Sequence, residues 1–348
     1  MELMRAARLH AIRNMLSVDS IPIPQLGTGD ALVGCRAAGI CHSDINYRDG
    51  ISPVAHLPIT LGHEISGIVV KSGKDVHGIK QGDRVCAHYV ISCGRCEYCT
   101  TDRETYCDKY QMIGKDVDGG FAEYVRVPAS NLLTIPDSVP FEQAAVLGCA
   151  VATAYHALRR GRTKAGDTIL INGVGGLGLH AVQLASRIFN VEKIIAVDVL
   201  DEKLNLAGKH GASALLNSRK VNVADQIERI TGGRSVDLSL DFVGRKGTIE
   251  NAVRWVGKGG RLVVVGISSE EIHLSPYSSI IGKEMEIIGV NDHLKSELAQ
   301  LIQYVSSGKL DLSNSITQRV ALEDVNHGMQ ILQDNVGNPV RTVVRMEP

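Results

Sequence analysis

Two rhythms of hydrophobic and polar residues divide the chain. Up to about residue 150, short Val- and Ile-rich runs are broken by Gly, Pro and Asp, which is typical of antiparallel β-structure folded back into a barrel-like domain. The clearest strands that this pattern predicts are residues 31–35, 65–71, 83–87 and 121–127. We therefore expect the first part of the chain to be mainly β.

From residue 168 to residue 290, apolar runs alternate with stretches of helical periodicity. This alternation predicts βαβ units and a parallel, doubly wound sheet. The predicted strands are residues 168–172, 193–198, 212–217, 236–242, 261–267 and 285–290. The first of them contains an uninterrupted apolar run, as a strand covered by helices on both faces requires.

The tail of the chain contains two helical stretches, around residues 294–307 and 322–335, and a strand-like stretch at 340–345. We assign it to the β-rich part, so the expected domains are residues 1–150 with 291–348, and residues 151–290. A chain of 348 residues with 44% hydrophobic side chains is long enough to bury two such cores.

Composition narrows the classes of partner. The formal net charge is −1 and the basic residues are scattered, so we expect no partner of the nucleic-acid or anionic-membrane class. A membrane-spanning helix is excluded because no run of about 18 apolar residues occurs. The eight cysteines favour metal binding or catalysis in a reducing compartment over disulfides. We therefore expect a cytoplasmic protein that acts on a small molecule.

A glycine-rich turn follows the first predicted strand of the α/β part. Gly173, Gly175 and Gly178 form the pattern G-x-G-x-x-G, with an additional glycine at Gly176, and helical sequence comes next. In this context the first glycine permits a tight turn and the second lets the backbone approach a pyrophosphate. The third allows close helix packing, and the helix N-terminus binds the anion. The turn therefore predicts a dinucleotide site.

Asp198 ends the next predicted strand, about 20 residues after Gly178. A carboxylate at this spacing can bind both hydroxyls of the adenosine ribose. The alternative is an aspartate that merely ends a strand in a turn. Val199 and Leu200 offer no group for a 2′-phosphate, which the charge of Asp198 would repel. The sequence therefore favours NAD over NADP.

Four cysteines lie close together in one polar segment. Cys93, Cys96, Cys99 and Cys107 form the pattern C-x2-C-x2-C-x7-C, and the surrounding residues show no apolar periodicity. Four thiolates at this spacing can close a tetrahedral zinc site, with an iron–sulfur cluster as the minor alternative. Because four protein ligands leave no open position, this site is expected to brace a lobe at about residues 91–108 and to do no chemistry.

Spaced motifs along nearly the whole chain resemble those of the zinc-containing medium-chain alcohol dehydrogenases. In chain order they are Ala38-Gly39-Ile40-Cys41-His42-Ser43-Asp44, Leu61-Gly62-His63-Glu64-Ile65-Ser66-Gly67, Gly82-Asp83-Arg84-Val85, the four-cysteine segment, Gly148-Cys149 with Thr153, the glycine turn, and Val340-Arg341-Thr342. The resemblance implies a mainly β, GroES-like catalytic domain that carries the zinc-binding lobe, and an α/β Rossmann coenzyme domain. It also implies reversible hydride transfer between a primary or secondary alcohol and NAD, with an aldehyde or ketone as the product.

The same resemblance implies a catalytic zinc ion held by Cys41, His63 and Cys149, with the fourth position left for water or substrate oxygen. Glu64 would either enter the coordination sphere when water leaves or pair with Arg341. Asp44 would orient His63 through its other ring nitrogen. The expected metal content is therefore two zinc ions per chain.

Proton transfer and cofactor contacts are also implied by the resemblance. Ser43 would accept the hydroxyl proton of the substrate and pass it toward the cofactor ribose. Many family members carry a histidine at the end of this relay, but this chain has Asn46, which cannot titrate. The route would therefore end in ordered water or at His42. The residues that the resemblance places at the cofactor are His42 and Arg341 (pyrophosphate), Leu177 and Thr153 (nicotinamide), and Lys203 (adenosine ribose).

For several of these residues ordinary structural roles compete with the functional ones: a surface position for His42, a solvated helix charge for Lys203, and core packing for Leu177. Three other functions compete as well. They are a polyol, sugar or amino-alcohol dehydrogenase of the same superfamily, a zinc-free quinone or enoyl reductase, and a non-enzymatic zinc-binding protein. Pairing of the last central strand across a two-fold axis, as in similar enzymes, would give a homodimer or homotetramer.

Overall fold

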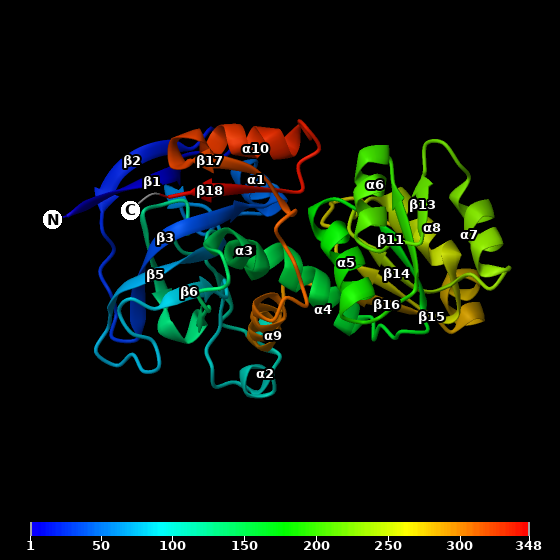
Figure 1. Ribbon diagram of the computed structural model, residues 1–348, viewed down its shortest axis with the longest axis horizontal. Helices are drawn as coiled ribbons and strands as arrows, with labels where there is room; N and C mark the ends of the chain where they lie inside the picture. Colours follow the sequence, from blue (N-terminus) through cyan, green and yellow to red (C-terminus); the bar gives the residue numbers. More distant parts are fainter. Residues whose placement is uncertain (1, 347–348) are drawn as a thin grey trace. The chain divides into compact units, whose positions relative to one another are not determined.

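The computed structural model describes residues 2–346. They form two compact units: one comprises the chain up to Ala152 and from His293 onward, and the other runs from Thr153 to Asp292. The blue and red parts of the chain accordingly belong to the same unit in Figure 1. Within the described residues, no helix is both long and apolar enough to cross a membrane.

The first unit is built around a mainly antiparallel sheet. In spatial order its described strands are β10 (Leu132–Thr134), β6 (Arg84–Ala87), β5 (Glu64–Ser72), β3 (Asp30–Ile40), β18 (Arg341–Arg345) and β17 (Ile316–Ala321), and β9 (Tyr124–Pro128) also pairs with β3. β17 and β18 run parallel, whereas β3 pairs antiparallel with β5, β9 and β18. This architecture confirms the predicted mainly β fold class of the catalytic domain, and the C-terminal strands β17 and β18 lie in its main sheet.

Smaller elements complete this unit. β2 (Ser17–Pro22), β1 (Leu3–Leu9) and β4 (Ile59–Thr60) form a second sheet, and β7 (Val90–Ile91) pairs with β8 (Gln111–Met112). The helices are α1 (His42–Arg48), α2 (Glu97–Thr100), α3 (Phe141–Val146), α9 (Lys295–Ser306) and α10 (Val325–Gln333). α3 packs against β3 and β5, and α10 packs against β17, β18 and β3. Because β3 contacts both helices and lies inside the sheet, it is buried along nearly its whole length.

One predicted strand of this unit is shorter than expected. The predicted strand at 121–127 begins only at Tyr124, because the backbone of Phe121 bonds with other segments. Its N–H donates to the carbonyl of Leu61, and its own carbonyl accepts from the N–H of Ala7. The apolar run therefore starts as a loop that joins the two sheets.

The second unit contains a parallel sheet. Its described strands, in spatial order, are β13 (Ala214–Asn217), β12 (Lys193–Asp198), β11 (Thr168–Asn172), β14 (Val236–Asp241), β15 (Val256–Val264) and β16 (Glu286–Gly289). Every residue of β11 is buried, as its apolar run predicts. The predicted doubly wound sheet is confirmed, and its strand order reverses beside β11, where ligands bind in open α/β sheets.

Four helices of the second unit cover this sheet. They are α5 (Gly176–Arg187), α6 (Asp201–Lys209), α7 (Val223–Thr231) and α8 (Lys246–Trp255). α5 and α6 pack beside β11, β12 and β13 (Figure 1), whereas α8 contacts β14 and β15. β15 begins at Val256, earlier than the predicted residue 261, because a bulge in its pairing with β14 accommodates the glycine-rich stretch at 257–260.

Candidate active site

Cys41, His63, Glu64 and Cys149 form a buried cluster of potential metal ligands. One ligand atom from each lies within 4.8 Å of the others. Cys41 follows the end of β3. His63 directly precedes β5, and Glu64 is the first residue of that strand and pairs with Gly39 of β3. Cys149 comes from η3 (Leu147–Val151), a π-helical turn between α3 and α4 (Ala152–Arg160). Such turns are frequent at functional sites.

His63 is oriented by Asp44. The Asp44 Oδ1 atom lies 3.2 Å from His63 Nδ1, and the same carboxylate accepts hydrogen bonds from the backbone N–H groups of Cys41 (2.8 Å) and Gly62 (3.3 Å). The other ring nitrogen, Nε2, is buried without a hydrogen-bond partner. A buried polar atom of this kind calls for a partner, and a zinc ion among the clustered ligand atoms supplies one. The donor set of two sulfurs and one imidazole therefore fits zinc.

The buried thiols and the imidazole shift one another's pKa. A hydrogen bond from the Cys149 thiol, helped by His63, holds the pKa of Cys41 well below its usual range although burial opposes this. That same hydrogen bond, together with burial, raises the pKa of Cys149 well above its usual range. Burial lowers the pKa of His63, but Asp44 and Cys41 outweigh burial and raise it. Zinc binding to this set therefore releases protons, which makes zinc affinity depend on pH.

Glu64 lies beside these ligands and is paired with Arg341. Both side chains are buried, and Glu64 Oε2 has no hydrogen-bond partner. Burial raises the pKa of Glu64 to about 7 although the charge of Arg341 lowers it. Gly39 leaves room for this carboxylate, since a Cβ atom there would come 1.9 Å from Oε2. The predicted pairing with Arg341 is present. The unpaired oxygen, Oε2, is available for the other predicted role of Glu64, that of a metal ligand.

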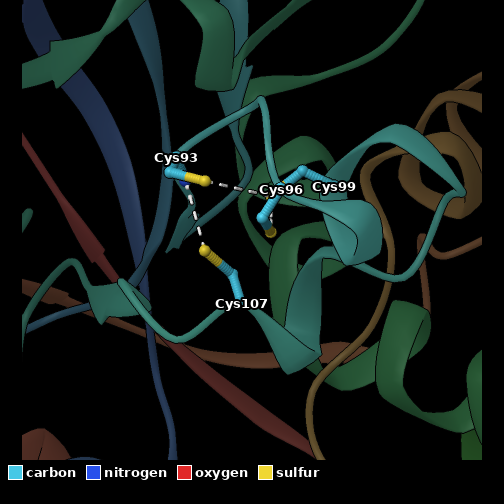
Figure 2. Close-up of side chains that lie close together, drawn as sticks. All are labelled: Cys93, Cys96, Cys99 and Cys107. Carbon is cyan, nitrogen blue, oxygen red and sulfur yellow. Dashed lines mark hydrogen bonds between the residues drawn. The ribbon is translucent and has the colours of Figure 1, made fainter.

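The four cysteines of the polar segment face a common centre, as Figure 2 shows. Their sulfur atoms lie within 4.8 Å of one another, and Cys99 Sγ is 3.4 Å from Cys96 Sγ and 3.9 Å from Cys93 Sγ. Ligands about 2.3 Å from a tetrahedral zinc ion are separated by about 3.8 Å. Backbone N–H groups of Arg95 and Cys96 lower the pKa of Cys93 to about 6, which favours the thiolate that zinc requires. The lobe is therefore a second candidate zinc site.

The glycine turn connects β11 to α5 in the way that its spacing predicts. Gly173 has a φ of +83°, and a Cβ atom on Gly178 would lie 1.9 Å from the carbonyl oxygen of Gly173. Gly175 precedes the first helical residue, and a Cβ atom there would meet nothing within 4 Å. The helix N-terminus therefore presents its N–H groups to open space, where a phosphate can bind.

Asp198 stands at the end of β12, directly beside this turn. Its Oδ2 accepts a hydrogen bond from the N–H of Val174 (2.9 Å), and its Oδ1 accepts from those of Val199 (2.7 Å) and Leu200 (3.1 Å). The carboxylate thus holds both the glycine turn and the next loop. Because each carboxylate oxygen can accept more than one hydrogen bond, this local role and ribose binding are compatible.

Comparison with known proteins identifies the family. The family model of the alcohol dehydrogenase GroES-like domain matches residues 27–137, and that of the zinc-binding dehydrogenase matches residues 176–307. The chain is 36% identical to an alcohol dehydrogenase of Geobacillus stearothermophilus, over 93% of this chain and 94% of the relative. It belongs to the zinc-containing medium-chain alcohol dehydrogenase family.

Proteins similar to this chain differ in what they act on or bind. A sorbitol dehydrogenase of Bacillus subtilis is 32% identical over 94% of this chain and 93% of the relative. A solved structure from Escherichia coli CFT073, described as a short chain alcohol dehydrogenase in complex with NADH, matches with a TM-score of 0.93 and 26% identity, over 99% of this chain and 100% of that one. The chain is therefore a zinc-dependent dehydrogenase acting on CH–OH groups.

The remaining predicted residues of this dehydrogenase lie in varied surroundings. Ser43 Oγ is 3.7 Å from Cys41 Sγ, at the edge of the ligand cluster, whereas the neighbouring His42 is exposed. Thr153 is buried, and its hydroxyl has no hydrogen-bond partner. Leu177 and Lys203 are partly exposed, on α5 and α6. Arg341 is only 2% exposed, so in this structure its side chain serves the Glu64 pair and reaches little solvent.

Two aromatic residues of the site were not predicted from the sequence. The ring of Tyr89 meets that of His63 edge to face with 5.1 Å between centroids, and Tyr47 does so at 6.4 Å. Both tyrosines are buried. No motif includes them, because they act through ring packing between segments that are distant in sequence.

Proposed function

We propose that this dehydrogenase transfers hydride reversibly between an alcohol and NAD, giving an aldehyde or ketone. The observation that carries the proposal is the buried set of Cys41, His63 and Cys149, in which the Nε2 atom of His63 has no hydrogen-bond partner. When bound there, zinc would polarise the substrate oxygen and favour loss of its proton. Asp44 keeps the imidazole in place by binding Nδ1.

Ser43 is our candidate for the group that takes the hydroxyl proton. Its Oγ lies at the edge of the ligand cluster, within reach of an oxygen bound beside Cys41. The side chain of Asn46 cannot continue the relay by titration, and the backbone carbonyl of this residue accepts hydrogen bonds from the backbone N–H groups of Ile51 and Ser52. The proton therefore leaves through ordered water or through the exposed His42. Replacing Ser43 with Ala should lower kcat by about a hundredfold while zinc content stays the same.

NAD is the nicotinamide cofactor that the charge of Asp198 favours. A related zinc-binding dehydrogenase of known structure, from Sinorhizobium meliloti 1021, binds NADP, so membership of the family does not decide the cofactor. A 2′-phosphate placed beside the carboxylate of Asp198 would be repelled, and such like-charge contacts cost several kcal/mol. Replacing Asp198 with Asn should therefore lower the ratio of kcat/KM for NAD to that for NADP by about tenfold or more. An unchanged ratio would remove this argument for NAD.

The substrate class is tested with a panel of simple alcohols, polyols, sugars and amino alcohols, following NADH formation. We favour simple primary or secondary alcohols, because some polyol-type relatives replace the third zinc ligand with a carboxylate and this chain has Cys149. Turnover of polyols alone would instead establish a polyol dehydrogenase, the second candidate function, which the similarity to a sorbitol dehydrogenase specifically supports.

We also propose a homodimer or homotetramer that works in the cytoplasm. β16 ends the described order of the parallel sheet and presents mostly exposed or partly exposed residues, so it can pair with the same strand of a second copy. None of the eight cysteines forms a disulfide, which agrees with a reducing compartment. Light scattering after size exclusion tests the assembly, and a monomer would refute it.

A further inference from the structure

The four-cysteine lobe is tied to the beginning of α9. Glu104, which lies between two of the lobe's cysteines in sequence, accepts a hydrogen bond from the backbone N–H of Lys295 (2.6 Å). Asp102 of the same lobe accepts one from the hydroxyl of Ser296 (2.9 Å). In Figure 1 the orange α9 accordingly lies beside the cyan lobe. The first N–H groups of a helix have no partner within the helix, and a carboxylate is favoured there. The lobe therefore supplies a partner for the first N–H group of α9, beside the bond that Glu297 of the helix itself makes to the N–H of Leu294.

His293, which precedes the N-cap residue Leu294 of this helix, continues the connection toward the catalytic ligands. His293 is fully buried, and its backbone carbonyl accepts a hydrogen bond from Nε2 of His88 (3.0 Å). Its ring meets the ring of Tyr89 edge to face, with 5.0 Å between centroids and 81° between the planes. Tyr89 in turn meets His63 at 5.1 Å and 79°. A continuous series of buried rings thus runs from the start of α9 to the catalytic imidazole.

We propose that Glu104 and His293 are positioning residues through which the four-cysteine lobe fixes the ring orientation of His63. The proposal rests on the proposed function in one respect, that His63 binds zinc. Asp44 holds one nitrogen of the His63 ring, but a single hydrogen bond allows the ring to turn about it. Contact with Tyr89, whose ring lies closer to His63 than that of Tyr47, restricts this freedom, because packed interiors resist small displacements. The two candidate zinc sites are therefore mechanically connected within one unit.

The first test compares three variants of the zinc-loaded protein. Glu104→Ala removes the acceptor for the Lys295 N–H, whereas Glu104→Gln keeps an acceptor oxygen. The control is Glu97→Ala, because Glu97 is an exposed carboxylate of the same lobe and pairs with Arg103. Each protein is treated with a chelator and iodoacetamide, and mass spectrometry follows alkylation of Cys41 and Cys149. We expect alkylation of these thiols to be about tenfold faster in Glu104→Ala than in the wild type. In Glu104→Gln and Glu97→Ala it should proceed at nearly the wild-type rate.

A double-variant cycle then tests whether the effect travels through the ring series, since mere proximity is no proof of coupling. His293→Leu preserves bulk and the backbone carbonyl while removing the imidazole; His293→Gln replaces it if the first variant does not fold. When the His293 substitution is combined with Glu104→Ala, Cys41 and Cys149 should be alkylated no faster than in the faster-reacting single variant. A wild-type rate in Glu104→Ala, or effects that multiply in the double variant, would overturn the proposal. Because the readout is metal retention, a lack of alcohol oxidation would refute the proposed function and leave this result standing.

Discussion

Replacement of Asp44 with Asn tests the proposed catalytic zinc site most sensitively. Asp44 is fully buried and receives hydrogen bonds from His63, Cys41 and Gly62 through its two carboxylate oxygens. Asn keeps one acceptor oxygen and presents an NH2 donor in place of the other. At least one of the three N–H groups then faces a donor, and leaving such a buried group unpaired costs about 1–3 kcal/mol. The negative charge that favours a metal-bound imidazole is lost as well.

Loss of such an outer partner lowers metal affinity by about 10- to 100-fold, which corresponds to about 1.4–2.7 kcal/mol. The assay is a zinc competition titration with a chelator, and alkylation of Cys41 shows which site has lost its metal. We expect the catalytic zinc to weaken by this factor and the zinc of the lobe to stay bound. Asp49→Asn is the control. Asp49 directly follows α1, the helix that contains Asp44, and pairs with Arg48. Catalytic zinc affinity within about twofold of wild type in Asp44→Asn would refute the role of Asp44.

Three further perturbations test other parts of the account. Cys41→Ser should abolish turnover with little loss of thermal stability, whereas Cys96→Ser should chiefly lower the unfolding temperature in calorimetry; equal stability losses would contradict the division of roles. Gly178→Ala should weaken NADH binding by about tenfold or more in a fluorescence titration, because its Cβ would meet the carbonyl of Gly173 at 1.9 Å; wild-type affinity would show that the turn does not hold the cofactor. Burial lowers the pKa of His88 from 6.5 to about 4, so the unfolded chain binds more protons between these values and stability is lost as pH falls through them. His88→Gln should therefore remove about 2 kcal/mol of the stability difference between pH 7 and pH 5 in denaturant titrations, and an unchanged difference would argue against a buried neutral imidazole.

The sequence predicts best those features whose physics is local. The strands β11 and β12 have the predicted ends, because an apolar run bounded by polar residues or glycine specifies a buried parallel strand. The four-cysteine lobe and the glycine turn are equally local, since each places its chemistry within about 15 residues. Their geometry in the structure follows directly from that spacing.

Features that depend on packing between distant segments could not be predicted from local sequence patterns. Cys41, His63 and Cys149 are united only by the pairing of β3 with β5 and by a π-helical turn, and resemblance to a known family, not spacing, predicted them as a set. The rings of Tyr89 and His293 come together from segments about 200 residues apart, and no local pattern marks such a contact. The burial of Arg341 could not be predicted from sequence either, because its pairing with Glu64 is a tertiary contact.

The measurement that tests the central claim most directly combines metal analysis with turnover on one preparation. Zinc per chain is determined by elemental analysis, and NADH absorbance is followed after addition of NAD and a panel of alcohols and polyols, for the wild type and for Cys41→Ser. The account predicts two zinc ions per chain and NADH formation in the wild type, and one zinc ion without turnover in the variant. One zinc ion and no NADH formation in the wild type would contradict it and favour a zinc-free reductase or a binding protein.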